Sequence, residues 1–431
     1  MRIIHHLFAI KKKGPKEFYR KVRLLKILLI EITWFAFFLP FSICAIFVIK
    51  ALSPYVIIRL SPLRSWRIGH YVSNSELYLY ERKNGINQGS IRTVDVWFDE
   101  TKPCNLQFRI MLSRVINIYP RCLVQPVYIL NNWLPGAYKY NIPKTVCSDR
   151  DVLNLIDGAN FSNYFEFTDE EEARGEIELE KLGINNKSKF VCLAVRDSAY
   201  LAHQKNENST GVDWSYHDYR DTEIKTYELA AKELVKNGYY VVRMGAKVNT
   251  KMNTNDPMII DYASNGMRSD FMDVYLGAKC VFCISTSTGY DAIPRLFQKP
   301  LCIVNQPHVE WFYSWLPDTI TIFQKVKDVK TGKYLSLKTI IDSGIGAYGK
   351  SHQFIENGVE LIENTPEEIK DAVLEMISRT SGKWNDTWFD DVVRHQIEFI
   401  YIDSKINGKI LSRFGTEFLK DNLYLLEDNY V

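Results

Sequence analysis

The second half of this chain alternates short apolar runs with amphipathic stretches, and this alternation restricts the fold more than any other feature. Each run is apolar and short, as in parallel strands that are buried on both faces. The runs are Phe190–Val195, Tyr239–Val242, Met258–Ile260, Cys280–Ile284 and Leu301–Val304. Helices are expected between them at 222–237, 270–277 and 290–297, and another opens at Thr365-Pro366 and runs to about 378. The pattern predicts an α/β fold with a doubly wound, Rossmann-type sheet.

The first half shows the same alternation more weakly. We expect strands at 65–68, 76–80, 93–98 and 124–128 and a helix over 106–118. An acidic helix is expected at 169–182, capped by Thr168, and the turn-rich segment 183–188 separates the two halves. The predicted organisation is a Rossmann-like domain at 55–183 and a second one at 184–380. Residues 381–431 are expected to form C-terminal helices, part of which cross back to the first domain.

Residues 1–54 are basic at first and then apolar. The first 26 residues contain nine Lys or Arg and one acidic residue, Glu17. The run 27–49 carries one charge, Glu31, and is long enough for a membrane span. Pro40 lies near its middle and basic residues continue beyond it, so a single kinked span and a re-entrant hairpin broken at Pro40 both remain open. Either arrangement predicts attachment to membrane lipid through residues 1–50, helped by the attraction of basic residues to anionic lipid.

The charge balance of the remaining chain disfavours nucleic acid as a partner. Without the first 26 residues the chain has 45 basic and 50 acidic side chains, a net charge of about −5. A nucleic-acid-binding protein needs basic residues clustered on its folded domain. The 23 Phe, 25 Tyr and 9 Trp residues exclude a disordered chain. The eight cysteines are interpreted as reduced, packed thiols.

Polar and basic residues follow the predicted strands of the second domain. The carboxyl ends of parallel strands meet at one edge of a sheet, where such folds bind ligands, so we expect these residues to share a site. Arginine offers phosphate a bidentate partner, and small residues before a helix leave backbone N–H groups free for an anion. The sequence therefore predicts a diphosphate site. Its candidate residues are Arg196, Arg243, Gly245, Arg268, Ser269, Asp270, Ser285, Thr286, Ser287, Thr288 and Gly289.

These groups also have structural interpretations. Arg196 and Asp197 can form a surface ion pair, Arg243 can pair with a carboxylate such as Asp261, and residues 285–289 can form a capped turn. The G-x-G-x-x-G signature and the P-loop are absent, which disfavours nicotinamide, flavin and P-loop enzymes. The Cys280–Cys283 pair lies in a predicted buried strand and is interpreted as two structural thiols rather than a metal site.

A set of segments carries a resemblance to a known family. They are Asp261–Leu276, Ile284–Gly289, Lys299–Asn305, Arg67–His70, Val195–Asp197, His217–Arg220 and Tyr240–Gly245. Together they resemble a family of bacterial glycosyltransferases associated with the biosynthesis of surface polysaccharide (O-antigen, lipopolysaccharide or capsule), over most of residues 60–385. More distantly the layout is similar to heptosyltransferases and other GT-B enzymes, whose two Rossmann-like domains face each other across a cleft.

The resemblance implies a glycosyltransferase whose second domain binds a nucleotide-sugar donor. The first domain would bind the acceptor, a lipid-linked or lipopolysaccharide glycan, with Gly69 and His70 as acceptor-binding residues. We expect no metal or other cofactor, because arginines and a helix N-terminus can stabilise a departing diphosphate. Asp149-Arg150-Asp151, which has the spacing of a metal-binding DxD motif, is interpreted as helix capping. The expected location is the cytosolic face of the bacterial inner membrane, where nucleotide sugars are made.

An inverting transferase also needs a base for the acceptor hydroxyl. The candidate catalytic residues are Asp197, His217 and Asp218, and the loop 201–213 is expected to cover the donor. Two other functions remain open. One is a non-catalytic assembly protein of a polysaccharide-synthesis complex, and the other is a GT-B-fold nucleotide-sugar epimerase.

Overall fold

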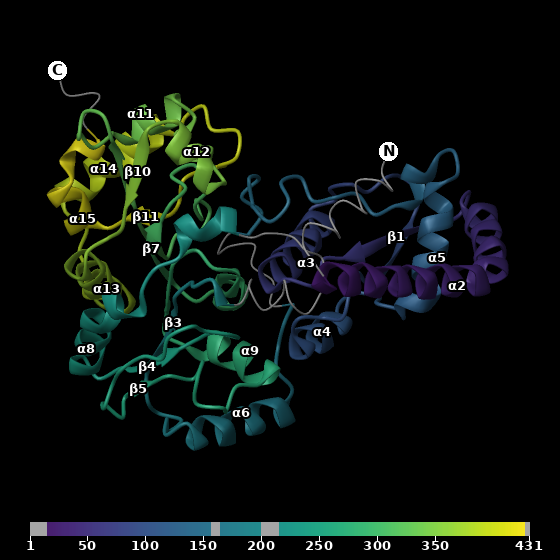
Figure 1. Cartoon of the computed structure of the whole chain (residues 1–431), viewed down its shortest axis with the longest axis horizontal. Helices are drawn as coiled ribbons and strands as arrows, with labels where there is room; N and C mark the ends of the chain where they lie inside the picture. Colours follow the sequence, from purple (N-terminus) through teal and green to yellow (C-terminus); the bar gives the residue numbers. More distant parts are fainter. Residues whose placement is uncertain (1–14, 157–163, 200–214, 427–431) are drawn as a thin grey trace.

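The computed structural model describes residues 15–156, 164–199 and 215–426, which form two α/β parts (Figure 1). The N-terminal part holds a two-stranded parallel sheet in which β1 pairs with β2. Its elements are α2 (Pro15–Leu52), β1 (Ile57–Leu63), α3 (Ile68–Lys83), β2 (Thr93–Asp99), α4 (Leu106–Ser113), α5 (Arg121–Asn132) and the 3-10 helix η1 (Ala137–Tyr140).

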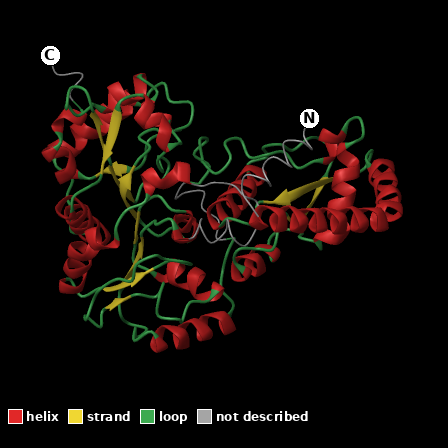
Figure 2. Ribbon diagram, viewed as in Figure 1, coloured by secondary structure: helices red, strands yellow, loops and turns green. Residues whose placement is uncertain are grey.

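The C-terminal part is built on a seven-stranded parallel sheet (Figure 2). Its strands are β3 (Phe190–Ala194), β4 (Tyr240–Arg243), β5 (Ile259–Ile260), β6 (Cys283–Ser285), β7 (Leu301–Gln306), β8 (Thr319–Phe323) and β11 (Arg413–Phe414). They are arranged in the order β5-β4-β3-β6-β7-β8-β11. The chain therefore winds outward in one direction from β3 and in the other from β6. The predicted doubly wound α/β sheet is confirmed.

The two faces of this sheet are covered by two separate hydrophobic cores. Val191 and Leu193 of β3 point into the core that contains α8 (Glu228–Lys236) and α13 (Pro366–Thr380). Phe190, Cys192 and Ala194 point the other way, toward α6 (Asp169–Lys181) and α9 (Asp270–Lys279). Because successive strand residues face opposite sides, a strand that is apolar throughout requires helices on both faces.

The remaining elements complete the C-terminal part. A two-stranded antiparallel sheet is formed by β9 (Lys325–Asp328) and β10 (Val359–Ile362). The other helices are η2 (Ser215–Arg220), η3 (Ile224–Tyr227), η4 (Gly289–Asp291), α10 (Ala292–Leu296), α11 (Leu337–Asp342), η5 (Ile345–Ala347), α12 (Ser351–Glu356), α14 (Trp388–Ile400), α15 (Thr416–Asp421) and η6 (Leu423–Leu425).

The secondary structure expected for the first half needs correction. The segment 93–98 is a strand as predicted, and the acidic helix with its Thr168 cap is confirmed. Residues 76–80 and 124–128 are helical, in α3 and α5, and 65–68 is a loop that leads into α3. In α3 nearly every residue from Tyr71 to Glu81 is buried, so an apolar run that reads as a strand is a helix enclosed on all sides.

The sequence prediction also missed strand β1. This strand carries Arg59, which does not suggest a buried position. The guanidinium is buried because it donates two hydrogen bonds to Asp95 of β2, at 2.6 and 2.7 Å. A buried charge is tolerated when it is paired and hydrogen-bonded in this way.

The segment before the expected boundary at 183–188 and the C-terminal segment both pack on the large sheet. Leu179 and Leu182, which precede the expected boundary, lie in the core of the large sheet. Helices α14 and α15 of the C-terminal segment also pack on the large sheet. The loop that follows α14 reaches residues assigned to the first domain, where the Arg150 side chain donates to the Ile406 carbonyl oxygen at 3.0 Å and to Asn407 at 2.6 Å.

Helix α2 is continuous through Pro40 but bends along its length (Figure 1). A proline inside a helix removes a hydrogen bond and crowds the preceding turn, which explains a bend at this position. The two arms run at a wide angle to each other (Figure 1), so the helix is neither a straight span nor a hairpin with antiparallel arms.

The two α/β parts share one hydrophobic core. Tyr71 and Val72 of α3 and Phe108 of α4 pack in the same cluster as Val274 of α9 and Ile293 of α10. An ion pair crosses this contact, with Arg295 Nη1 2.6 Å from Glu76 Oε2 and both side chains almost fully buried. The N-terminal end of α3 is thereby held against the carboxyl edge of the large sheet.

Candidate active site at the carboxyl edge of the large sheet

The point where the winding direction reverses lies between β3 and β6. In doubly wound sheets ligands bind in the crevice at this point, outside the carboxyl ends of the strands. The two loops that leave these strands are joined, since the backbone N–H of Arg196 donates to Thr286 Oγ1 at 2.9 Å. The structure therefore brings the predicted residues after the first and fourth strands of this domain together.

The turn after β6 is held by its own hydroxyl groups. Both Ser285 and Thr288 donate hydrogen bonds to Asp291, which is fully buried. Burial raises the pKa of Asp291 to about 7, against the opposite effect of these two hydrogen bonds. Ser287 has a positive φ of 56°, which turns the chain sharply before η4. The side chains of Ser285, Thr286 and Thr288 thus support the turn, whereas we had predicted that they contact a donor.

Two arginines lie beside this turn. Arg196 Nε lies 3.1 Å from Asp221 Oδ1, so its charge is partly compensated. Arg220, at the end of η2, donates from Nη2 to the Ser287 carbonyl oxygen at 2.5 Å. Among the described residues Arg220 has no ion pair, and its Nε is shielded from solvent without a hydrogen-bond partner. Burial and the nearby positive charge of Arg196 lower the pKa of Arg220 to about 10.

Two histidines lie beside the arginines. Burial, together with the positive charges of Arg220, Arg196 and Arg67, lowers the pKa of His217 to about 4. His308, just after β7, has its pKa lowered to about 3 by burial and by Arg220 and His217. Its Nε2 is 2.9 Å from the Tyr219 hydroxyl oxygen. Both imidazoles are neutral near pH 7. We did not predict His308, although its place after a buried strand of the same edge is a signal that the sequence contains.

The N-terminal part closes the site from the other side. A Cβ atom on Gly69 would lie 2.9 Å from the Cα atom of Gly289, so the two backbones touch. The next residue, His70, has its Nδ1 3.4 Å from Asp149 Oδ2. Burial lowers the pKa of His70, against the attraction of Asp149. The predicted acceptor residues Gly69 and His70 therefore lie at the predicted donor turn.

Several predicted site residues have structural roles instead. Asp197 accepts hydrogen bonds from the backbone N–H groups of Ala199 at 2.9 Å and Asn249 at 2.8 Å, so it fastens two loops. The Asp218 side chain is exposed to solvent. Arg243 is buried, donates to the Thr250 carbonyl oxygen at 2.6 Å and lies 3.3 Å from Asp261. Arg243 thus forms the ion pair with Asp261 that the sequence offered as its structural alternative, and donor binding by Arg243 stays a prediction.

The residues at the start of α9 hold this helix and its contact with α4. Ser269 caps α9 by accepting from the Met272 N–H at 3.1 Å, and Arg268 pairs with Asp273 at 2.5 Å. Asp270 accepts from the Leu106 N–H at 2.8 Å and thereby joins α9 to the N-terminus of α4. Gly245 packs against Val248. These four predicted donor-binding residues do not converge on the turn after β6, because their polar groups are used locally.

The other motifs behave as structural elements. Cys280 and Cys283 are buried free thiols. Residues 147–154 contain turns and no helix begins there, so the interpretation of Asp149-Arg150-Asp151 as helix capping is wrong. Asp151 accepts from the Ile156 N–H at 2.6 Å, and Arg150 makes the contacts described above. Within the described ranges no group of three or more His, Cys, Asp or Glu side chains could hold a metal ion. The loop 201–213, predicted to cover the donor, lies outside the described residues.

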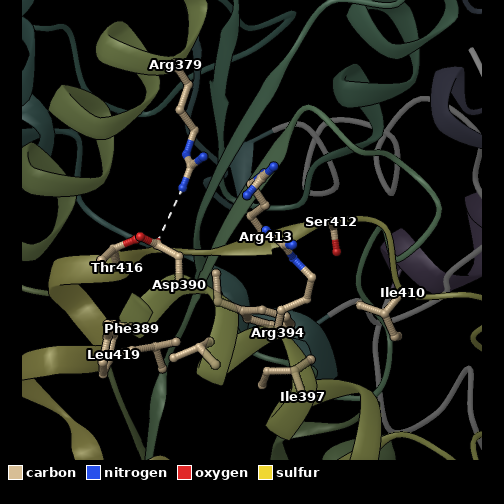
Figure 3. A pocket seen from close by; sticks show the side chains of 12 residues that line it. Arg379, Phe389, Asp390, Arg394, Ile397, Ile410, Ser412, Arg413, Thr416 and Leu419 are labelled. Carbon is tan, nitrogen blue, oxygen red and sulfur yellow. Dashed lines mark hydrogen bonds and ion pairs between the residues drawn. The ribbon is translucent and has the colours of Figure 1, made fainter. Parts of the chain in front are cut away.

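A second pocket lies away from this edge, between α13, α14, β11 and α15 (Figure 3). Arg379, Arg394 and Arg413 border it, and each lies within 3.0 Å of Asp386. Against partial burial, the hydrogen bonds and charges of Arg413 and Arg379 hold the pKa of Asp386 at about 2. Because a carboxylate already neutralises part of this charge, the pocket is a weaker candidate for an anion than the turn after β6.

The comparisons with known proteins give similarity in fold. No family model and no curated protein matches the sequence. The structure is similar to a glycosyl transferase family 9 protein from Veillonella parvula, with 9% identity, 75% of this chain and 97% of that chain covered, and a TM-score of 0.41. It is also similar to E. coli ADP-heptose lps heptosyltransferase II, with 12% identity, 76% and 99% coverage and a TM-score of 0.37. A putative UDP-N-acetylglucosamine 2-epimerase from Listeria monocytogenes has 8% identity, 83% and 99% coverage and a TM-score of 0.28. At these values the similarities do not indicate an activity for this chain.

Proposed function

We propose that this protein is a glycosyltransferase whose arginine-lined edge binds the diphosphate of a nucleotide-sugar donor. The observation that carries the proposal is the guanidinium of Arg220, which is partly buried at the winding reversal without an ion pair among the described residues. Shielding a charge from water is costly unless an opposite charge compensates it. A bound diphosphate would supply that charge.

The surroundings of Arg220 favour a phosphate over other anions. Arg196 lies on the same edge of the sheet. Arg67 comes from the N-terminal part, and its positive charge lowers the pKa of His217, as that of Arg220 does. The starts of η4 and α3 meet at the contact between Gly69 and Gly289. Guanidinium groups and free N–H groups at helix starts are the groups that bind phosphates in proteins.

The reaction that fits this arrangement is transfer of the sugar to a hydroxyl group. The bond between the acceptor oxygen and the anomeric carbon forms while the bond between that carbon and the phosphate oxygen breaks. The electron pair leaves with the diphosphate, where the arginines stabilise the developing charge. The hydroxyl proton goes to a base, and we assign this role to His217 because its imidazole is neutral at pH 7 and lies among the arginines.

The proposed acceptor is a lipid-linked or lipopolysaccharide glycan, and the proposed location is the cytosolic face of the bacterial inner membrane. Two observations support this part of the proposal. Residues 28–52 of α2 are long and apolar enough for a membrane segment. The site residue Gly69 is contributed by the same N-terminal part that carries α2. We propose no metal for the reaction, because the arginines can stabilise the leaving group.

Nucleotide binding tests the proposal directly. The full-length protein in detergent is titrated with UDP, GDP, CDP, ADP and TDP, and with the matching nucleosides. We expect one diphosphate to bind and its nucleoside to bind far more weakly. Arg220→Gln should weaken the binding of that diphosphate by tenfold or more, because a hydrogen bond to a charged group contributes about 1.5–3 kcal/mol. Arg394→Gln, on α14, is the matched control and should bind as the wild type does. Equal affinity of the wild type and Arg220→Gln would refute the proposed site.

A product assay separates the three functions. Membranes are incubated with the radiolabelled nucleotide sugar whose nucleotide binds. Label in the lipid fraction indicates a transferase, and a soluble isomer of the donor indicates an epimerase. Binding with neither product supports the assembly protein. Activity that EDTA abolishes and manganese restores would contradict the expected metal independence.

A further inference from the structure

Helix α2 exposes large apolar side chains on both sides of its bend. Phe37 is 72% exposed and Phe47 is 74% exposed, and Trp34 and Phe41 are about half exposed. A soluble protein rarely leaves a continuous apolar surface of this extent in water, so the surface indicates a partner. We call the exposed apolar side of residues 28–52 the α2 surface.

The geometry of α2 does not fit a helix that crosses a bilayer. Residues 27–39, between the last basic residue and Pro40, make 13 residues, which correspond to about 20 Å of helix. The hydrocarbon core of a bilayer is about 30 Å thick. Helix α2 bends along its length, and its second arm runs in another direction (Figure 1).

The α/β body also packs against the middle of the apolar stretch 27–49, which would have to cross the bilayer. Glu31 is 3.5 Å from Arg121 at the start of α5, and the Phe35 ring is 5.5 Å from the Trp133 ring. In the second arm Ile46 is buried in a core with residues of α5, β1 and β2. A folded sheet with polar side chains cannot occupy the hydrocarbon layer. Part of the stretch of α2 that would have to cross the bilayer therefore packs on the α/β body.

The surroundings of the α2 surface fit the boundary between lipid and water. Trp133 and Tyr138, which follow α5, are 67% and 76% exposed, and such aromatic residues are enriched at membrane interfaces. The nine Lys and Arg of residues 1–26 precede the apolar stretch in the sequence, and basic residues are attracted to anionic lipid headgroups. Apolar side chains, interfacial aromatics and basic residues occur together where a protein contacts the surface of a membrane.

We propose that the α2 surface binds one leaflet of an anionic bilayer and does not cross it, so that the N-terminus and the α/β body lie on the same side of the membrane. This proposal is independent of the proposed transferase activity. It differs from both arrangements that the sequence leaves open, because it places α2 along the membrane surface.

The orientation is tested in native membranes of a bacterial host. The full chain carries one epitope tag before Met1 and another after Val431. We expect both tags to be resistant to protease in intact spheroplasts and both to be cleaved in inverted vesicles. Cleavage of one tag in spheroplasts and of the other in inverted vesicles would show a spanning helix and overturn the proposal.

The lipid contact is tested with purified protein. After removal of detergent, the protein is floated with vesicles of phosphatidylcholine containing 30% phosphatidylglycerol. We expect the double substitution Phe37→Asp and Phe47→Asp to reduce binding at least tenfold. The matched control replaces two equally exposed apolar residues elsewhere, Ile355→Asp and Ile402→Asp, and should bind as the wild type does. Equal binding of both double variants would overturn the assignment of the α2 surface.

Discussion

The ion pair between Arg295 and Glu76 provides a quantitative test of the contact between the two α/β parts. The two atoms are 2.6 Å apart, and the side chains are 1% and 2% exposed. Arg295 also donates to Ser73 Oγ at 2.8 Å. Burial raises the pKa of Glu76, against the attraction of Arg295. Removal of either partner leaves a buried charge without compensation, which costs about 3–5 kcal/mol.

The two single substitutions should respond differently to pH. In Arg295→Met, Glu76 can take up a proton, and at pH 7 this costs about 3.7 kcal/mol relative to its ordinary pKa of about 4.3. At pH 5 the same protonation costs about 1 kcal/mol, so Arg295→Met should recover about 2.7 kcal/mol. Glu76→Gln leaves a guanidinium that cannot lose its proton, so it should recover little.

The assay is urea unfolding of the detergent-solubilised protein, followed by tryptophan fluorescence at pH 7 and pH 5, with the wild type as the reference at each pH. The double variant Glu76→Leu with Arg295→Met should be within about 1–2 kcal/mol of the wild type, because replacement of a buried pair by apolar residues is often neutral. A cost below about 1 kcal/mol for both single variants, or no recovery of Arg295→Met at pH 5, would refute this account of the contact.

Three further measurements test the site. Gly69→Ala should lower activity and melting temperature because its Cβ would lie 2.9 Å from the Gly289 backbone, whereas Gly89→Ala, with open space around it, should change neither. The folded state disfavours the charged form of His308. Between pH 7 and pH 5 the wild type should therefore lose about 2 kcal/mol of unfolding free energy relative to His308→Gln. A difference between the two proteins that stays constant with pH would contradict the lowered pKa. If His217 removes the acceptor proton, His217→Asn should reduce the transfer rate about 100-fold or more, while Asp197→Asn should reduce it less than tenfold. The reverse order would restore Asp197 as the base.

The sequence was most informative where burial is uniform along an element. The strands of the large sheet are apolar at nearly every position, and helices with a cap such as Thr365 and Pro366 have a local start signal. The first half was less predictable because the apolar runs of helices α3 and α5 are buried by the rest of the fold. The spacing of their apolar residues therefore does not separate helix from strand. Strand β1 depends on the partner of Arg59, which only the fold supplies.

The sequence predicted a site at one edge of the large sheet, and the structure brings several of its residues together there, whereas their binding roles stay predictions. Topology alone places the residues after β3 and β6 together, so Arg196 and the Ser285–Gly289 turn followed from the strand pattern. Which arginine is left without a carboxylate depends on neighbours that are distant in sequence. Arg243 is neutralised by Asp261, and Arg220 has no equivalent partner among the described residues. No local pattern distinguishes these two arginines.

The core shared by α3, α4, α9 and α10 has a consequence for how turnover proceeds. In enzymes whose domains meet across a solvent-filled gap, a hinge motion can admit one substrate and expel another. Here such a motion would strip Tyr71, Val72 and Ile293 of their apolar neighbours and separate Arg295 from Glu76. The two α/β parts are therefore expected to keep their relative position when nucleotide is added, with small-angle scattering profiles that are the same with and without nucleotide.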